Sequence, residues 1–266
     1  MSLDFSGRVA IVTGAGGGLG REHALALAKR GAKVVVNDLG GARDGSGGSA
    51  SAAQAVVDEI IAAGGEAIAN SASVTDYAAV QNMVAEVMAA WGRIDILVNN
   101  AGILRDKSFA KMDISDFREV LDVHLMGAVH CCKAVWPIMQ EQKYGRIIMT
   151  TSSSGLYGNF GQSNYGAAKL ALVGLMQTLA LEGQKYDIRV NSLAPTAATR
   201  MTEALFPPEL LATLKASDVV PAMLVLACEA APSRKILCAG AGTFEAADIS
   251  LTQGVYLGQG EGIAEQ

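Results

Sequence analysis

Short apolar runs alternate along the chain with longer segments whose apolar residues recur at helical spacing. The short runs are rich in β-branched residues and almost uninterrupted, which is typical of parallel strands buried on both faces. The pattern predicts strands at 8–13, 33–37, 66–70, 95–100, 146–152 and 188–194, and helices at 19–30, 50–63, 76–91, 117–141 and 164–185.

This alternation predicts the fold class α/β, as a Rossmann-type doubly wound parallel sheet with helices on both faces. Neither an internal repeat nor an interior linker interrupts the sequence, so residues 1–266 are interpreted as a single dinucleotide-binding and catalytic domain. The Gly- and Ser-rich stretch 40–51 lies between a predicted strand and the next helix, and it is interpreted as a mobile loop.

Composition narrows the class of partner. A net charge of −5 gives no reason to expect nucleic acid or an anionic membrane as a partner. The sequence shows neither a signal peptide nor an apolar stretch of membrane-spanning length. Its four cysteines lack a Cys-x-x-Cys pattern, which favours reduced thiols in a cytoplasmic protein. The three histidines lack ligand spacing, so no metal is expected.

The turn after the first predicted strand is rich in glycine. In "TGAGGGLG", Gly14 allows a sharp turn, Gly18 lets the backbone approach a pyrophosphate, and Gly20 lets helix and strand pack closely. Phosphates would lie at the helix N-terminus, where free N–H groups and the helix dipole favour an anion. Because this turn lies between a strand and a helix, it predicts a dinucleotide site.

Asp38 directly follows the second predicted strand, ~20 residues beyond the glycines, where an acid accepts hydrogen bonds from ribose hydroxyls. A carboxylate there repels a 2′-phosphate, and Gly17 and Leu39 supply no basic side chain to attract one. These positions favour NAD as the cofactor. The structural alternative is an aspartate that only caps the following loop.

Asn100, Ala101 and Gly102 follow the fourth predicted strand in "LVNNAGIL". Amides and a glycine at the carboxyl end of a strand suit a close approach to a bound cofactor. A turn that merely closes the strand is the alternative.

Tyr165 and Lys169 share one face of a predicted helix, in "SNYGAAKLALVGL". A surface lysine beside a half-buried phenol is the structural alternative. Ser152 ends the fifth predicted strand, upstream of this pair.

In this order the glycine turn, Asn-Asn-Ala-Gly, the serine and Tyr-x-x-x-Lys resemble the short-chain dehydrogenase/reductase family, over residues 5–205. The resemblance implies that Tyr165 is the general acid/base. Lys169 would lower the pKa of the phenol and hold the nicotinamide ribose, and Ser152 would bind the substrate oxygen. It also implies cofactor contacts at Leu19, Val74, Pro195 and Thr199.

His124, in "LDVHLMG", departs from the family pattern, because many members carry a relay asparagine at this position. An imidazole can donate and accept hydrogen bonds, so it can hold the same relay water. A buried core histidine on an apolar helix face is the alternative.

The phrases "VVVNDLGGARDGSGG", "GLYGNFGQ" and "RMTEALFP" resemble one branch of the family, the (3R)-hydroxyacyl-CoA dehydrogenase domains of peroxisomal multifunctional enzymes. That resemblance implies NAD-dependent oxidation of (3R)-hydroxyacyl-CoA to 3-oxoacyl-CoA. A hydroxysteroid or other secondary-alcohol dehydrogenase, and a non-catalytic NAD(H)-sensing protein, are the alternatives. The chain ends without a Ser-Lys-Leu address, so a free-standing relative is expected.

A substrate lid is expected at about 195–215, in the family's lid position. An apolar tail of the substrate would lie against Leu156, Tyr157, Leu205 and Phe206. Basic residues that could meet CoA phosphates, unless they are solvated surface, are Arg105, Lys107, Lys111 and Arg200.

The two long helices that include 121–140 and 163–183 are apolar on more faces than one sheet contact would cover. This pattern, together with the family resemblance, predicts a homodimer or homotetramer.

Overall fold

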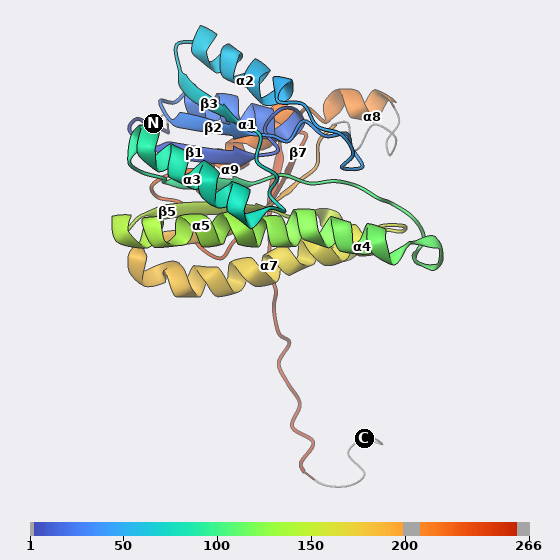
Figure 1. The fold of residues 1–266 in the computed structure, drawn as a ribbon. Coiled ribbons are helices and arrows are strands. Elements are labelled where there is room, and N and C mark those ends of the chain that lie inside the picture. The colour runs from blue at the N-terminus through green and yellow to red at the C-terminus, as the bar shows by residue number, and fades with distance from the viewer. Residues whose placement is uncertain (1–2, 199–207, 260–266) are drawn as a thin grey trace.

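The computed structural model describes residues 3–198 and 208–259 of the chain. Within them, one sheet has the strand order β3-β2-β1-β4-β5-β6-β7-β8 (Figure 1). The strands are β1 (Val9–Thr13), β2 (Lys33–Asn37), β3 (Glu66–Asn70), β4 (Ile96–Asn99), β5 (Gly145–Thr150), β6 (Ile188–Pro195), β7 (Ile236–Gly240) and β8 (Thr243–Ala247).

Helices cover both faces of this sheet (Figure 1). Along β1, Ala10 and Val12 pack into one core, and Val9 and Ile11 into the other. Burial on both faces explains the uninterrupted apolar strands. The first core includes α1 (Gly18–Ala28), α2 (Ser51–Ala62) and α9 (Val220–Ala227), and the second includes α3 (Tyr77–Trp91), α5 (Gly127–Gln142) and α7 (Ser163–Gly183).

Shorter helices complete the fold. They are α4 (Ile114–Leu121), which packs on α7, α6 (Ser153–Tyr157) and α8 (Pro208–Thr213).

The six predicted strands and the doubly wound fold class are confirmed. The sheet is parallel except at one edge, where β8 is antiparallel to β7. A tight turn reverses the chain there, with positive φ at Ala241 and Gly242. The single helix predicted at 117–141 is wrong. It is divided into α4, a π-helical turn at Asp122–Met126, and α5.

The stretch 40–51 includes the loop that connects β2 to α2, as expected, and this loop is anchored to a neighbouring segment. It is hydrogen-bonded to the segment that follows β4, through Leu104 N to Arg43 O at 3.0 Å and Arg105 Nε to Asp44 O at 3.0 Å.

Strand order positions the site. β1 lies between β2 and β4, so the chain reverses its direction of winding between β1 and β4. Ligands of such sheets bind in the crevice outside the carboxyl ends of the strands at this switch point. The segment after β8 runs away from the body and takes no part in that crevice (Figure 1). Among the described helices, none is long and apolar enough to cross a membrane.

Candidate active site

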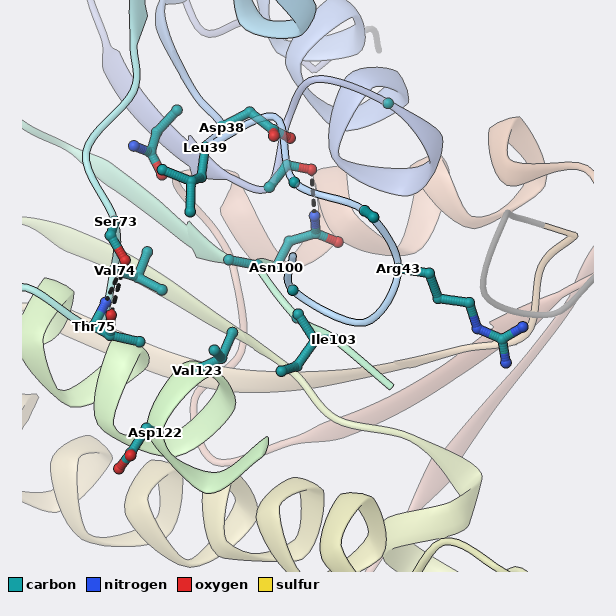
Figure 2. Close-up of a pocket in the computed structure, with 18 of the residues that line it drawn as sticks. Asp38, Leu39, Arg43, Ser73, Val74, Thr75, Asn100, Ile103, Asp122 and Val123 are labelled. Carbon is teal, nitrogen blue, oxygen red and sulfur yellow. Dashed lines mark hydrogen bonds between the residues drawn. The ribbon is translucent and has the colours of Figure 1, made fainter. Parts of the chain in front are cut away.

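A cavity of about 410 Å³ opens at the carboxyl ends of β1, β2 and β4 (Figure 2). Most of the cofactor residues predicted from the sequence line it, namely Gly14, Gly18, Leu19, Asp38, Val74, Asn100, Ala101 and Gly102. Sequence reasoning missed several others that it includes, among them Arg43, Ile103, Glu119 and Asp122. Gly20, Pro195, Tyr165 and Lys169 do not line this cavity.

The glycines of the first turn shape its wall. Gly14 and Gly18 have φ of 63° and 52°, a region that favours glycine. A Cβ on Gly20 would collide with the carbonyl oxygen of Gly14 and come within 2.6 Å of Asn100 Nδ2. Gly20 therefore sets the close packing of α1 on the strands. The first turn of α1 carries no acidic side chain, so its N-terminus suits an anion.

Asn100 fixes this turn from the neighbouring strand. Its Nδ2 donates to Thr13 O and Gly14 O, both at 3.0 Å, and its own N–H donates to Thr13 Oγ1 at 3.0 Å. The side chain is thus committed to the backbone of the glycine turn, which it holds open toward the cavity.

The Asp38 carboxylate is held at the cavity wall by two backbone donors. Gly16 N donates to Oδ2 at 2.7 Å and Gly40 N to Oδ1 at 2.6 Å. A carboxylate has about four acceptor positions, so others remain for a ligand. Asp38 therefore both fixes the adjoining loops and presents negative charge to the cavity, which combines the two sequence interpretations.

Ser152, Tyr165, Lys169 and His124 come together from three places in the fold, which are the start of α6, the helix α7 and the π-helical turn. The Ser152 hydroxyl faces the Tyr165 phenol closely enough to lower its pKa. The rings of Tyr165 and His124 meet edge to face, with centroids 5.2 Å apart. Lys169 Nζ lies 5.4 Å from the centroid of the Tyr165 ring. Ser152 also caps α6, since its Oγ accepts from Ser154 N at 3.2 Å.

Burial controls the charge of these groups. It raises the pKa of Tyr165 to about 12, and the Ser152 hydroxyl opposes the rise. Burial lowers the pKa of Lys169 to about 7, and its Nζ donates to Thr150 O at 2.6 Å. Burial, with the charge of Lys169, holds the pKa of His124 well below its usual range, so this imidazole is neutral at pH 7.

His124 lies in the middle of the π-helical turn, a distortion frequent at functional sites. Its Nε2 lies 2.8 Å from Ile103 O and 3.1 Å from Ile103 N. Nδ1 is buried with no protein hydrogen-bond partner, as is Asn99 Oδ1. Both residues line a second cavity of about 10 Å³ together with Lys169. That volume is about one water molecule.

The two cavities adjoin. Val74, Ala101 and Val123 line both of them, and a Cβ on Gly102 would collide with Cε1 of His124. His124 and Lys169, which line the smaller cavity, therefore lie next to the larger one, and Tyr165 contacts both of them.

The expectation that Arg105 and Lys107 meet CoA phosphates is not supported by their surroundings. Arg105 forms ion pairs of 2.8 Å with Asp116 and Glu119, and Lys107 pairs with Asp113 at 3.0 Å and Asp116 at 2.9 Å. Thr199, Arg200, Leu205, Phe206 and much of the expected lid lie outside the described residues. No group of metal-ligating side chains occurs in the part of the chain that the structure describes.

The comparisons with known proteins agree with this geometry. Residues 8–209 match the family model of the short chain dehydrogenases. The chain belongs to this family of oxidoreductases, whose members bind nicotinamide cofactors.

Three similar proteins are informative. Over 228 residues the chain is 55% identical to a peroxisomal hydratase-dehydrogenase-epimerase of Saccharomyces cerevisiae, covering 86% of this chain and 25% of that protein. The structure of full-length peroxisomal multifunctional enzyme type 2 from Drosophila melanogaster matches with a TM-score of 0.78 at 41% identity, covering 96% of this chain and 42% of that one. A 7α-hydroxysteroid dehydrogenase, solved with NADH and 7-oxo glycochenodeoxycholic acid, matches with a TM-score of 0.81 at 32% identity, covering 90% of this chain and 95% of that one.

The chain thus spans a quarter of the yeast relative and less than half of the Drosophila one. Both are named as multifunctional or peroxisomal proteins, and the matched part is the dehydrogenase part.

Proposed function

We propose that the chain is an NAD-dependent dehydrogenase that oxidises (3R)-hydroxyacyl-CoA to 3-oxoacyl-CoA. The observation that carries this proposal is the cluster of Ser152, Tyr165, Lys169 and His124, of which His124 and Lys169 line a small cavity that adjoins the larger one beside the glycine-rich turn. In this arrangement one polar oxygen of a substrate can be held beside a phenol and next to a dinucleotide site.

A nicotinamide cofactor fits the larger cavity. Glycines leave room for its phosphates at the N-terminus of α1, and Asp38 presents free acceptor positions to ribose hydroxyls. The bound nicotinamide would accept the hydride that leaves the carbinol carbon. The charge of Asp38 favours NAD over NADP, because a 2′-phosphate beside it would be repelled.

Tyr165 would take the proton of the substrate hydroxyl, with Ser152 holding the same oxygen. A phenol with a pKa of about 12 is a poor base at pH 7, so the site must favour the phenolate during reaction. Lys169 supplies positive charge close to the ring when it is protonated.

The proton would leave by way of the small cavity. His124 is neutral, touches the Tyr165 ring, and has Nδ1 free of protein partners. A water molecule in that cavity would reach both His124 and Lys169, and the imidazole would thereby replace the family's asparagine.

The substrate class rests on relatives. High identity to proteins named as peroxisomal multifunctional or hydratase-dehydrogenase-epimerase enzymes supports a hydroxyacyl-CoA ester. The similarity to a hydroxysteroid dehydrogenase supports the second candidate, a steroid alcohol. Each substrate is an apolar body with one secondary hydroxyl. The cytoplasmic location stays a prediction of the sequence, beside relatives named peroxisomal.

A substrate panel tests the proposal. The chain is assayed with NAD and NADP against (3R)- and (3S)-hydroxyacyl-CoA esters and a 7α-hydroxysteroid, by the absorbance of reduced nicotinamide. We expect turnover of the (3R) ester with NAD and little with the (3S) isomer. Steroid turnover without acyl-CoA turnover would transfer the assignment to the second candidate.

A further inference from the structure

The loop of residues 39–49 forms one side of the cofactor cavity. It is closed on itself, because Ser49 N donates to Leu39 O at 3.0 Å and Ala42 N to Ser46 O at 2.7 Å. Its tip is tied across to the segment after β4 by Leu104 and Arg105, and Figure 2 shows it passing Asn100 toward Ile103. The position of Arg43 at this tip is therefore defined by the fold.

Charge in the cavity is unbalanced. The charged residues among its described lining are Asp38, Arg43, Glu119 and Asp122, so Arg43 is the one cation against three acids. Glu119 is already paired with Arg105 at 2.8 Å. A dinucleotide or a CoA ester brings further phosphate charge to such a site, which a cation at its mouth would offset.

Arg43 is also the cation near the mouth whose own partner is weakest. Its guanidinium lies 4.0 Å from Asp106 Oδ2, and its side chain is 36% exposed. Asp106 Oδ2 also accepts from Gln162 Nε2 at 2.9 Å. An exposed pair at that distance contributes little, so Arg43 can exchange it for a stronger partner. Arg105 and Lys107, by contrast, each form two ion pairs of 3.0 Å or less.

We propose that Arg43 is an anion-binding residue that grips a phosphate group of a ligand bound in this cavity. The guanidinium fork matches a phosphate in two parallel hydrogen bonds, which a lysine does not. Arg43 is one of the residues that line the cavity, and in Figure 2 its side chain extends from the loop away from Asp122 and Thr75. From there it serves either the dinucleotide pyrophosphate or the phosphates of a CoA ester. This inference rests on the proposed function.

The experiment compares the wild-type chain with Arg43→Ala and Arg43→Lys. Arg118→Ala is the matched control, since Arg118 is exposed on α4 and does not line the cavity. Thermal unfolding first shows that each variant is folded. Dissociation constants are then measured for NADH, ADP-ribose and adenosine, and KM for a hydroxyacyl-CoA ester and for its pantetheine thioester, which lacks the nucleotide phosphates.

If the cofactor is the phosphate source, Arg43→Ala weakens NADH and ADP-ribose roughly tenfold and leaves adenosine unchanged. If CoA is the source, KM rises by a similar factor for the CoA ester alone. In either case Arg43→Lys keeps part of the affinity for that ligand. In Arg43→Ala the affected dissociation constant or KM depends less on salt concentration than it does in the wild type.

Unchanged constants for all these ligands in Arg43→Ala would overturn the inference, as would an equal loss in Arg118→Ala. Failure of the proposed function is distinguishable from this result. In that case the wild-type chain itself would bind no NADH or would not turn over the hydroxyacyl-CoA ester, whatever the state of Arg43.

Discussion

The imidazole of His124 lies edge-on to the phenol ring of Tyr165, with ring centroids 5.2 Å apart and an interplanar angle of 86°. The same imidazole contacts the backbone of Ile103 through Nε2, its buried Nδ1 has no protein hydrogen-bond partner, and the residue lines a small cavity together with Lys169. His124 is therefore either a buried core residue or the residue that holds a relay water in the small cavity.

Replacement of His124 distinguishes the two roles. We expect His124→Asn to keep turnover within about tenfold of wild type, because an amide also donates and accepts. His124→Leu, which fills the space without polar atoms, should lose about 10²-fold in kcat. Steady-state kinetics at saturating cofactor measure both. Equal kcat for His124→Leu and wild type would make His124 a core residue only.

Gly102 provides an independent test of the same ring. A Cβ at this position collides with Cε1 of His124, so Gly102→Ala should displace the imidazole and reduce stability by about 1–3 kcal/mol. The smaller side chain in Gly102→Ala/His124→Asn should restore part of that stability. Urea unfolding of the two single variants and the double variant gives the coupling free energy between Gly102 and His124. Strict additivity would show that the two residues act separately.

Lys169 should lower the stability of the folded protein. Its pKa falls from the ordinary 10.5 to about 7 on burial, so the folded state disfavours the ammonium. Lys169→Met should therefore stabilise the protein, by roughly 1–3 kcal/mol near pH 7, while removing activity. Between pH 7 and 10.5 the unfolded state binds the proton and the folded state does not, so wild-type stability rises with pH in this window.

The stabilisation by Lys169→Met should accordingly be largest below pH 7 and shrink as pH rises toward 10.5. Urea unfolding at several pH values measures it. A difference that grows with pH would contradict the pKa direction, and a destabilised variant would mean that the bond from Nζ to Thr150 O outweighs the burial of charge.

Asp38 should determine cofactor choice. Wild type should prefer NAD over NADP by about a hundredfold or more, which corresponds to several kcal/mol. Asp38→Ala/Leu39→Arg should narrow or reverse that preference, with some loss of stability because Gly16 N and Gly40 N lose their acceptor. Leu39→Arg alone is the control for added charge. Comparable affinity of the wild-type chain for the two cofactors would contradict the proposal.

Self-association remains a prediction, and exposed apolar residues on α7 form a candidate contact surface for it. Leu170 and Leu181 are 47% and 56% exposed on this helix, and Leu181 lines a groove with Trp136 and Tyr186. Sedimentation at micromolar concentration should give a dimer or tetramer mass. Leu181→Glu should shift it toward the monomer, and a monomeric wild type would refute the prediction.

The sequence predicted the strands that are buried on both faces, because a short uninterrupted apolar run bounded by turn residues is typical of such strands. It did not predict β7 and β8. "ILCAG" is only partly buried, and "TFEAA" forms an exposed edge strand without a fully buried residue. The π-helical turn was also missed, since the spacing of apolar residues in 117–141 continues through it.

For the site, sequence order identified the glycine turn, Asp38 and the tyrosine–lysine pair, because these motifs have fixed spacing. It could not show that Arg105 is paired with Glu119, or that Arg43 reaches the cavity, because those contacts join segments whose separation in the fold no local pattern records. Whether a charged side chain has an ion-pair partner depends on the tertiary structure.

Proton transfer by Tyr165 is the step on which the proposed hydride-transfer reaction depends most. The direct measurement is the formation of reduced nicotinamide from a (3R)-hydroxyacyl-CoA ester by wild type and Tyr165→Phe, beside cofactor dissociation constants for both. Tyr186→Phe, in the short 3-10 turn Gln184–Tyr186 that follows α7, is the matched control. We expect Tyr165→Phe to lose at least about 10²-fold in kcat with its affinity for NADH unchanged, while Tyr186→Phe behaves as wild type. Retention of more than about a tenth of wild-type turnover by Tyr165→Phe would contradict this role.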